Sequence, residues 1–384
     1  MKSNSGNWLV NGGKTNTADI PSLVSTLLTW ERVRSFNVGF DFGAFSNRLT
    51  GSFDYFVRKA VDMVGPAPQL PLVLGIAPAI VNNADMKSYG FEIELSWRDR
   101  IGEVDYGVKF NLADAQQKVV KYPNTTNAFS DWYAGKMSGE IWGYTSLGIA
   151  KTDEEMKEHL ASLPNGGQNQ LGNKWGAGDI MYADINGDGK IDGGKGTLAD
   201  PGDQRIIGNS TPRYNFGLVL DASYKGFDVS IFFQGVGKRD YAPIVGTNGA
   251  VFWGAVNNIW QSMAMEEHFD YFRPEGHPMG ANLNGYYPRP DFTSNKNHQV
   301  QTRYLQDASY IRLKNLQIGY TLPKQWINKL HINRCRVYVS GDNLWTGTSL
   351  ASMFDPETLA AGDWGSGKTY PLSKVISFGL NVNF

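Results

Sequence analysis

The residues with the clearest chemical potential lie in one short acidic stretch, Asp184-Ile-Asn-Gly-Asp-Gly-Lys-Ile-Asp192. Side chains that carry oxygen occupy its first, third, fifth and ninth positions, and glycine occupies the sixth, which is how a calcium-binding loop begins. Calcium takes six to eight oxygen ligands, and the glycine permits the sharp turn that brings the seventh backbone carbonyl to the ion. The stretch therefore predicts a structural calcium site. Its expected ligands are Asp184, Asn186, Asp188, Asp192 and the backbone carbonyl of Lys190.

One position of this loop departs from the calcium pattern. The twelfth residue should be a glutamate, and here it is Lys195. Asp200 or Asp203 would have to return and complete the ligand shell. The alternative interpretation is a solvated turn of Asn, Gly and Asp that holds no ion.

Aromatic residues in the expected long connections form a second group of candidates. Flat rings with a polar edge stack on sugar faces, while neighbouring Asn and Asp bind sugar hydroxyls. The same residue types also pack loops together or form belts at a membrane surface. The expected substrate-binding residues are Trp132, Trp142, Trp175, Trp253, Trp260 and Trp364.

Patterns for catalysis are absent from the sequence. The five histidines never form a His-x-x-x-His pair, and there is no Gly-x-Ser-x-Gly, phosphate loop or Gly-x-Gly-x-x-Gly. We predict no enzyme, no catalytic residue and no organic cofactor. The net charge of −1 gives no electrostatic reason to expect nucleic acid as a partner. The single cysteine, Cys335, excludes an internal disulfide framework.

The sequence pattern predicts that the elements positioning these residues are β-strands. In the last stretch, residues 375–384, Phe378, Leu380, Val382 and Phe384 point to one side, and polar or small residues point to the other. An amphipathic strand that ends on a C-terminal phenylalanine resembles the closing strand of an outer-membrane barrel. The last strand of a soluble sandwich has the same period, so the alternation alone leaves both open.

Hairpins and long connections alternate along the whole chain. We expect an irregular extracellular segment at 1–34, and then strands at 35–45 and 49–58, 89–97 and 104–112, 213–224 and 227–237, 309–322 and 334–344, and 374–384. The intervening long loops are 59–87, 113–211, 238–307 and 345–373. Short turns at one end and long loops at the other indicate an antiparallel transmembrane β-barrel. No apolar run reaches the roughly 18 residues that a membrane helix needs.

The strand count predicts only part of such a barrel. Nine strands cannot close a bacterial single-chain barrel, which has an even number, so a further strand is expected before Met1. The first 20 residues also lack the apolar core of a secretory signal peptide. We therefore expect residues 35–384 to form a C-terminal portion of a larger barrel.

Four longer stretches resemble a known family, the SusC/RagA-like TonB-dependent outer-membrane transporters of the Bacteroidetes. They are Leu28-Thr-Trp-Glu31 with Phe36-Asn-Val-Gly-Phe-Asp-Phe-Gly43, the acidic stretch at 184–192 with Asp200-Pro-Gly-Asp-Gln-Arg-Ile-Ile-Gly-Asn209, residues 224–237, and Tyr310–Pro323 with Arg336–Leu344. They follow the family's order and extend over most of the chain.

This resemblance implies an all-β fold, in which the chain supplies about the last nine strands of a roughly 22-stranded barrel closed by a plug. It implies TonB-driven import of oligosaccharides, or of peptides as second choice, and a SusD-like surface lipoprotein as partner. It also implies insertion by the barrel assembly machinery, with Phe378, Leu380, Val382 and Phe384 as the C-terminal signal. The signal peptide, plug and TonB-interacting segment of the family have no counterpart in the sequence.

Two alternatives from other classes stay open at this point. One is a secreted, calcium-stabilised β-sandwich that binds carbohydrate and is soluble without detergent. The other is a truncated, non-functional transporter fragment that leaves no stable protein in the membrane.

Overall fold

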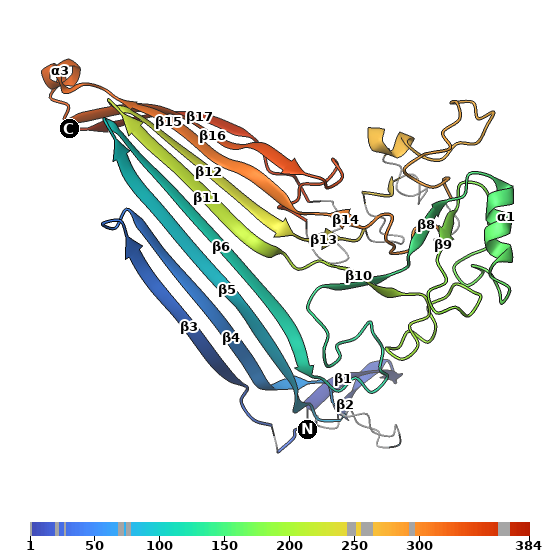
Figure 1. Ribbon diagram of the computed structural model, residues 1–384. Helices are drawn as coiled ribbons and strands as arrows, with labels where there is room; N and C mark the ends of the chain where they lie inside the picture. The colour runs from blue at the N-terminus through green and yellow to red at the C-terminus, as the bar shows by residue number, and fades with distance from the viewer. Residues whose placement is uncertain are drawn as a thin grey trace. The chain divides into compact units, whose positions relative to one another are not determined.

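A single antiparallel sheet dominates the chain (Figure 1). The computed structural model describes residues 2–19, 23–26, 28–67, 73, 78–243, 251–254, 264–291, 296–359 and 369–384. Nine strands pair in the order β17-β16-β15-β12-β11-β6-β5-β4-β3. Their bounds are β3 (Arg32–Ala44), β4 (Leu49–Gly65), β5 (Val81–Ile101), β6 (Val104–Lys121), β11 (Arg213–Tyr224), β12 (Phe227–Lys238), β15 (Tyr310–Thr321), β16 (Arg334–Thr348) and β17 (Val375–Asn383).

The register of these pairs separates an apolar face from a polar face. Residues directly opposite one another share a face, and the face alternates along each strand. Leu220 of β11 lies opposite Val108 and Ile231, whereas its neighbour Asp221 lies opposite Gly107 and Ser230. The alternation that the sequence shows is thus carried across strands. We call the side that holds Leu220 the apolar face and the side that holds Asp221 the polar face.

A tight turn at Lys225-Gly226 joins β11 to β12, as the sequence predicts. Both residues have positive φ, 47° and 90°, which matches the two-residue hairpin turn whose twist suits the strands it joins. The short turns after β5 and β15 lie at the same end of the strands, because the pairing is antiparallel. The loops at the opposite end are long.

The predicted boundaries need two corrections. Strands extend well into the expected long loops, since β4 continues to Gly65, β5 begins at Val81 and β6 runs to Lys121. The first 34 residues are also not irregular throughout, because β1 (Lys2–Val10) and β2 (Gly13–Asp19) pair as a hairpin and β3 begins at Arg32. Backbone pairing can continue where the apolar alternation stops, so the pattern marks only the middle of these strands.

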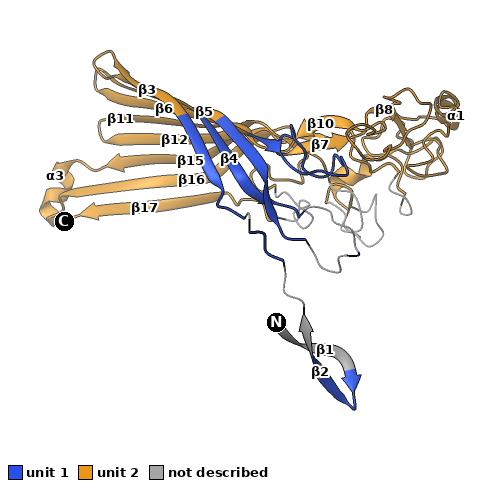
Figure 2. Ribbon diagram, turned by 90° about the horizontal axis from the view of Figure 1, so that it is seen from below, with its two compact units in different colours: residues 1–36, 56–89, 117–137 blue, residues 37–55, 90–116, 138–384 orange. Residues whose placement is uncertain are grey.

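The chain divides into two compact units (Figure 2). The first comprises residues 1–36, 56–89 and 117–137, and it contains an ion pair between Arg32 and Asp62. The second comprises residues 37–55, 90–116 and 138–384. None of the helices in the described residues is long and apolar enough to cross a membrane.

Within the second unit, the long connections carry their own small elements. They are β7 (Glu140–Gly143) with β10 (Arg205–Asn209), β8 (Ser146–Ile149) with β9 (Ile180–Tyr182), β13 (Asp240–Tyr241) with β14 (Gln306–Asp307), α1 (Asp153–Ala161) and η2 (Glu266–Phe269). A short helical turn, α3 (Lys324–Ile327) with η3 (Asn328–Leu330), joins β15 to β16. The Thr152 hydroxyl caps α1 by accepting the Glu155 N–H at 3.1 Å.

Candidate functional site: the polar face and the loop cluster

Charged side chains from non-adjacent strands meet on the polar face. The Arg336 guanidinium of β16 reaches across β15 and pairs with Asp228 of β12, its Nε 2.9 Å from a carboxylate oxygen. It also donates to the Gln317 side chain at 2.9 Å. Gly319 leaves the room for this crossing, because a side chain there would collide with the guanidinium. The pair therefore ties three strands together on the side of the sheet that the sequence predicts to be wet.

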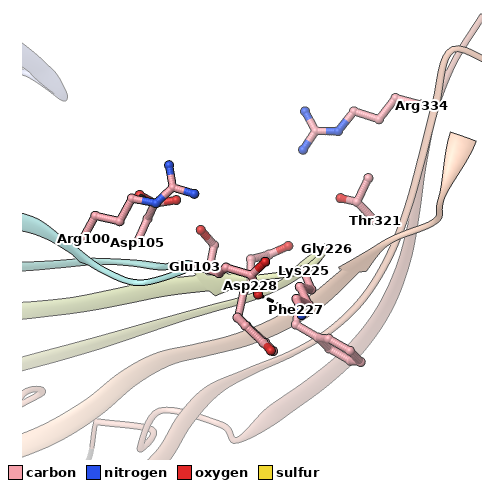
Figure 3. Close-up of a pocket in the computed structure, with 11 residues that line it drawn as sticks. Arg100, Glu103, Asp105, Lys225, Gly226, Phe227, Asp228, Thr321 and Arg334 are labelled. Carbon is pink, nitrogen blue, oxygen red and sulfur yellow. Dashed lines mark ion pairs between the residues drawn. The ribbon is translucent and has the colours of Figure 1, made fainter.

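Close to the short turns, the polar face forms an open hollow of about 470 Å³ (Figure 3). Lys225 pairs with Glu103 at 2.8 Å, and Arg100 lies 3.6 Å from Asp105. The three carboxylates and three cations of the lining balance one another. Such a surface is hydrated and polar, and nothing in its geometry pairs a nucleophile with a base. The charged lining residues are Arg100, Glu103, Asp105, Lys225, Asp228 and Arg334.

The predicted C-terminal signal residues lie on the apolar face. Phe378, Leu380 and Val382 of β17 lie opposite Val339, Val337 and Cys335 of β16. The side chains of Phe378, Leu380 and Phe384 are 85%, 64% and 80% exposed. A strand edge with bare apolar side chains needs an apolar surrounding, which is the role of lipid beside a barrel. The recognition role of these four residues stays a prediction.

At the opposite end, three long connections share one hydrophobic core. We call the described parts of residues 138–212, 239–309 and 349–359 the loop cluster. Phe252 is fully buried and contacts Tyr304 at 5.9 Å and Phe354 at 6.3 Å between ring centroids. Phe252 and Tyr304 belong to the connection 239–309, and Phe354 belongs to the connection 349–359. Their packing therefore holds these two connections together. The core also includes Tyr144, Ile180, Tyr182, Ile191, Trp253 and Tyr287.

The buried hydroxyls of Tyr182 and Tyr304 act as hydrogen-bond donors in this cluster. Burial raises the pKa of Tyr241 to about 12 and that of Tyr182 well above its usual value. The Tyr182 hydroxyl donates to the Lys296 carbonyl at 2.7 Å, and the Tyr304 hydroxyl donates to the Tyr286 carbonyl at 2.9 Å. These phenols stay protonated at neutral pH, and the Tyr182 hydroxyl joins two of the loop connections.

The predicted sugar-binding tryptophans that the structure describes differ in exposure. Trp253 is only 1% exposed and belongs to the core, which does not favour contact with substrate, and its binding role stays a prediction. Trp142 is half-buried in β7, and Trp175 turns its edge to Tyr182 while the Lys296 ammonium lies 5.0 Å from its ring centre. Trp132 remains 38% exposed. Trp260 and Trp364 lie outside the described residues.

A buried carboxylate that the sequence analysis missed organises the loop cluster. Asp179 is fully buried and accepts hydrogen bonds from Arg289 at 2.6 and 2.8 Å, from Lys296 at 2.9 Å and from the Asn297 side chain at 2.9 Å. The Gly176 N–H donates to it as well, at 2.9 Å. Its side-chain partners lie more than 100 residues away in the sequence, so no local pattern could reveal them.

The predicted calcium loop forms the sharp turn but not a metal shell. Gly187 and Gly189 both have positive φ, and their N–H groups donate to the Asp184 carboxylate at 2.6 and 2.8 Å. The Lys190 ammonium forms a short ion pair with Asp192, so the expected ninth-position ligand already has a cation beside it. In the part of the chain that the structure describes, no three acidic, His or Cys side chains are grouped to hold a metal. Calcium binding would require Asp192 to leave Lys190, and the calcium site stays a prediction.

The pKa shifts of Asp192 and Asp203 have their causes in the hydrogen bonds and burial of this loop. The hydrogen bond from Lys190 holds the pKa of Asp192 below its usual value. Burial raises the pKa of Asp203, although backbone N–H groups of Asp192, Ile185 and Asn186 oppose the rise. The Asp203 carboxylate accepts those bonds at 2.9, 2.8 and 3.4 Å, so it closes the loop through the backbone.

Comparison with known proteins decides the family. The family model described as "TonB dependent receptor-like, beta-barrel" matches residues 3–344. The chain belongs to this family. TonB-dependent receptors are outer-membrane β-barrel transporters, so the resemblance and the fold that the sequence predicts are confirmed. A single sheet of nine strands in the described residues also rules out the two packed sheets of the sandwich alternative.

Several curated relatives are similar to this TonB-dependent receptor chain over nearly its whole length. The TonB-dependent receptor P3 of Formosa agariphila is 28% identical, covering 98% of this chain and 36% of the relative. The TonB-dependent receptor SusC of Bacteroides thetaiotaomicron is 21% identical, covering 95% and 33%. The chain thus spans about a third of the length of these relatives.

Among solved structures, the RagAB peptide transporter shares the fold. It aligns with a TM-score of 0.70 and 22% identity over 100% of this chain and 38% of its own. In a receptor barrel the apolar face contacts lipid and the polar face lines the interior. The charged hollow beside the short turns lies on the polar face, the face that corresponds to the interior in such barrels.

Proposed function

We propose that the protein imports oligosaccharides through the outer membrane, as the barrel part of a SusC-type transporter driven by TonB. The observation that carries the import role is the two-faced sheet of a TonB-dependent receptor. Its register places apolar side chains such as Phe378 and Leu380 on one side, and the Arg336–Asp228 pair on the other. A sheet of this kind separates lipid from a wet interior, and the loop cluster sits at the long-loop end of the strands.

Oligosaccharide as cargo is supported by the resemblance to SusC-type transporters and by Trp132. The ring of Trp132 is 38% exposed, and the Lys136 ammonium lies 5.7 Å from its centre. An exposed indole beside a cation can stack on a sugar face. We expect Trp132→Ala to weaken oligosaccharide binding, with Trp345→Ala as a control, since Trp345 is exposed on the apolar face.

Peptide is the second candidate cargo. A protein described as the RagAB peptide transporter aligns with the whole of this chain, which favours this candidate specifically. The alternating charges of the polar face would suit a zwitterionic, extended peptide as well as a hydrated glycan. The fold suits both cargoes, so only a binding measurement distinguishes between oligosaccharide and peptide.

The resemblance to SusC-type transporters also suggests the partners of the proposed transporter. A SusD-like surface lipoprotein would contact the long loops, TonB would supply energy, and the barrel assembly machinery would recognise the strand that ends at Phe384. Calcium at residues 184–192 would be a structural addition to the loop cluster. It would not take part in import.

The deciding experiment uses the protein purified from its native outer membrane. Isothermal titration with a panel of oligosaccharides and of short peptides is expected to give heat only with oligosaccharides. Binding of peptides alone would assign the second cargo. A protein found only in the soluble fraction, without a band that shifts between unheated and boiled gels, would overturn the import function altogether. Failure to detect any protein would support the truncated-fragment alternative.

A further inference from the structure

One short turn at the polar hollow's end of the sheet differs from the others. The turns at Gly102-Glu103 and Lys225-Gly226 pair with each other through Glu103 and Lys225. The connection from β15 to β16 is longer and forms α3 and η3 (Figure 1). The connection, residues 322–333, contains two lysines, Lys324 and Lys329, and no Asp or Glu. This turn is therefore a cationic projection at the short-turn end.

The exposed side chains of this turn combine an indole with two ammonium groups. Trp326 is 64% exposed, although Ile327 beside it is only 3% exposed. Lys324 and Lys329 are both exposed, and no ion pair is found for either among the described residues. An amphipathic ring beside free ammonium groups is the combination that marks the boundary between lipid tails and headgroups.

Burial on β16 places the turn on the lipid side. Cys335 lies opposite Val382 on the apolar face, yet it is only 7% exposed. Val337, two residues further on the same face, is 41% exposed. Because α3 contacts β16, we attribute the cover over Cys335 to this helix. The turn is thus continuous with the apolar face that ends in Leu380 and Phe384.

We propose that the turn formed by α3 and η3 is a membrane-surface anchor that binds anionic phospholipid headgroups. Trp326 would lie at the level of the headgroups, and Lys324 and Lys329 would contact lipid phosphates. The anchor rests on the proposed place of the sheet in a bilayer. It fixes the depth of the short-turn end, so that β15, β16 and β17 keep one height relative to the lipid.

The test measures tryptophan quenching by brominated phospholipids after reconstitution of the full protein. The contribution of each indole is the difference between wild type and the matching Phe variant, Trp326→Phe or Trp345→Phe. Trp345 is 51% exposed on the apolar face towards the long loops, and it reports whether the sheet lies in the bilayer. We expect both indoles to be quenched, and Trp326 to be quenched more by brominated phosphatidylglycerol than by brominated phosphatidylcholine.

A charge variant separates the headgroup contact from simple apolar contact. Each lysine near an anionic surface contributes about a fivefold preference, so Lys324→Gln with Lys329→Gln should lower the preference for phosphatidylglycerol roughly 30-fold. Quenching of Trp345 without Trp326 would overturn the anchor and leave the import function intact, as would cross-linking of the turn to a soluble protein. Equal quenching of Trp326 by both lipids would also overturn it. Quenching of neither indole would contradict the membrane location itself.

Discussion

Replacing Asp179 by Asn should loosen the loop cluster more than any surface substitution. The carboxylate is fully buried and accepts five hydrogen bonds, two of them from Arg289 and one from Lys296, which is 1% exposed. Removing one partner of a buried ion pair costs about 3–5 kcal/mol, because the other charge stays buried. The carboxylate of Asp291 lies 3.8 Å from the Lys296 ammonium and can compensate in part. We therefore expect the lower value, about 3 kcal/mol.

Amide hydrogen exchange of the loop cluster measures this cost directly. An opening free energy that is lower by about 3 kcal/mol speeds exchange roughly 150-fold at the amides of Ile180 and Tyr182, which lie next to the substituted position. Glu275→Gln removes one charge from an exposed position of the same cluster and should leave these amides unchanged. The double variant Asp179→Asn with Lys296→Met should recover much of the loss, since it leaves no unpaired lysine.

Two results would refute this reasoning. An acceleration of less than about fivefold in the single variant would mean that Asp179 is not a buried counter-charge. A double variant that exchanges faster than the single one would mean that the Lys296 ammonium is stabilised mainly by the carbonyls of Asn173 and Lys174, to which it also donates.

Three further predictions concern the loops and the last strand. Burial raises the pKa of Asp355, but hydrogen bonds from Arg312 and from the Leu372 and Glu357 N–H groups lower it more, so this pKa lies below the usual 3.8. The stability that the carboxylate contributes is therefore present above pH 3.8 and is lost as the pH falls further. Amide hydrogen exchange in residues 350–359 should become faster as the pH falls below about 4. Lys190→Met frees Asp192, and it should strengthen calcium binding by isothermal titration, whereas no heat in either protein would refute the calcium prediction. Gly379→Val should disturb the pairing of β16 with β17, because the Tyr338 ring covers Gly379. The shift between unheated and boiled samples on gels should then be lost. Ser377→Val is the control on the same face, opposite Ser340, and should retain this shift.

The fold was predictable where apolar and polar residues alternate. The last strand was expected at 374–384 and is found at Val375–Asn383, and the turn at Lys225-Gly226 lies between the strands expected at 213–224 and 227–237. The ends of β4 and β5 were not predictable in this way. There, Asn82 donates to the Asp62 carbonyl and Asp85 accepts the Asp62 N–H at 3.0 Å, so polar residues continue the strands.

The candidate site was less predictable than the fold. The acidic stretch at 184–192 identified a sharp turn correctly, yet it could not show that Lys190 would pair with Asp192. Residue type alone could not distinguish Trp253, which is a core residue, from Trp132, which is exposed. That difference depends on which distant loops pack over each ring, and no local pattern records it.

The shared aromatic core of the loop cluster has a consequence for how such a transporter can change its specificity. Phe252 and Tyr304 come from one connection, Tyr182 from another and Phe354 from a third, and the rings pack into one core. Replacing one of these loops with that of a relative would leave rings without their partners in the other two. A change of cargo preference would then require all three connections to be exchanged together. The strands could instead diverge one residue at a time.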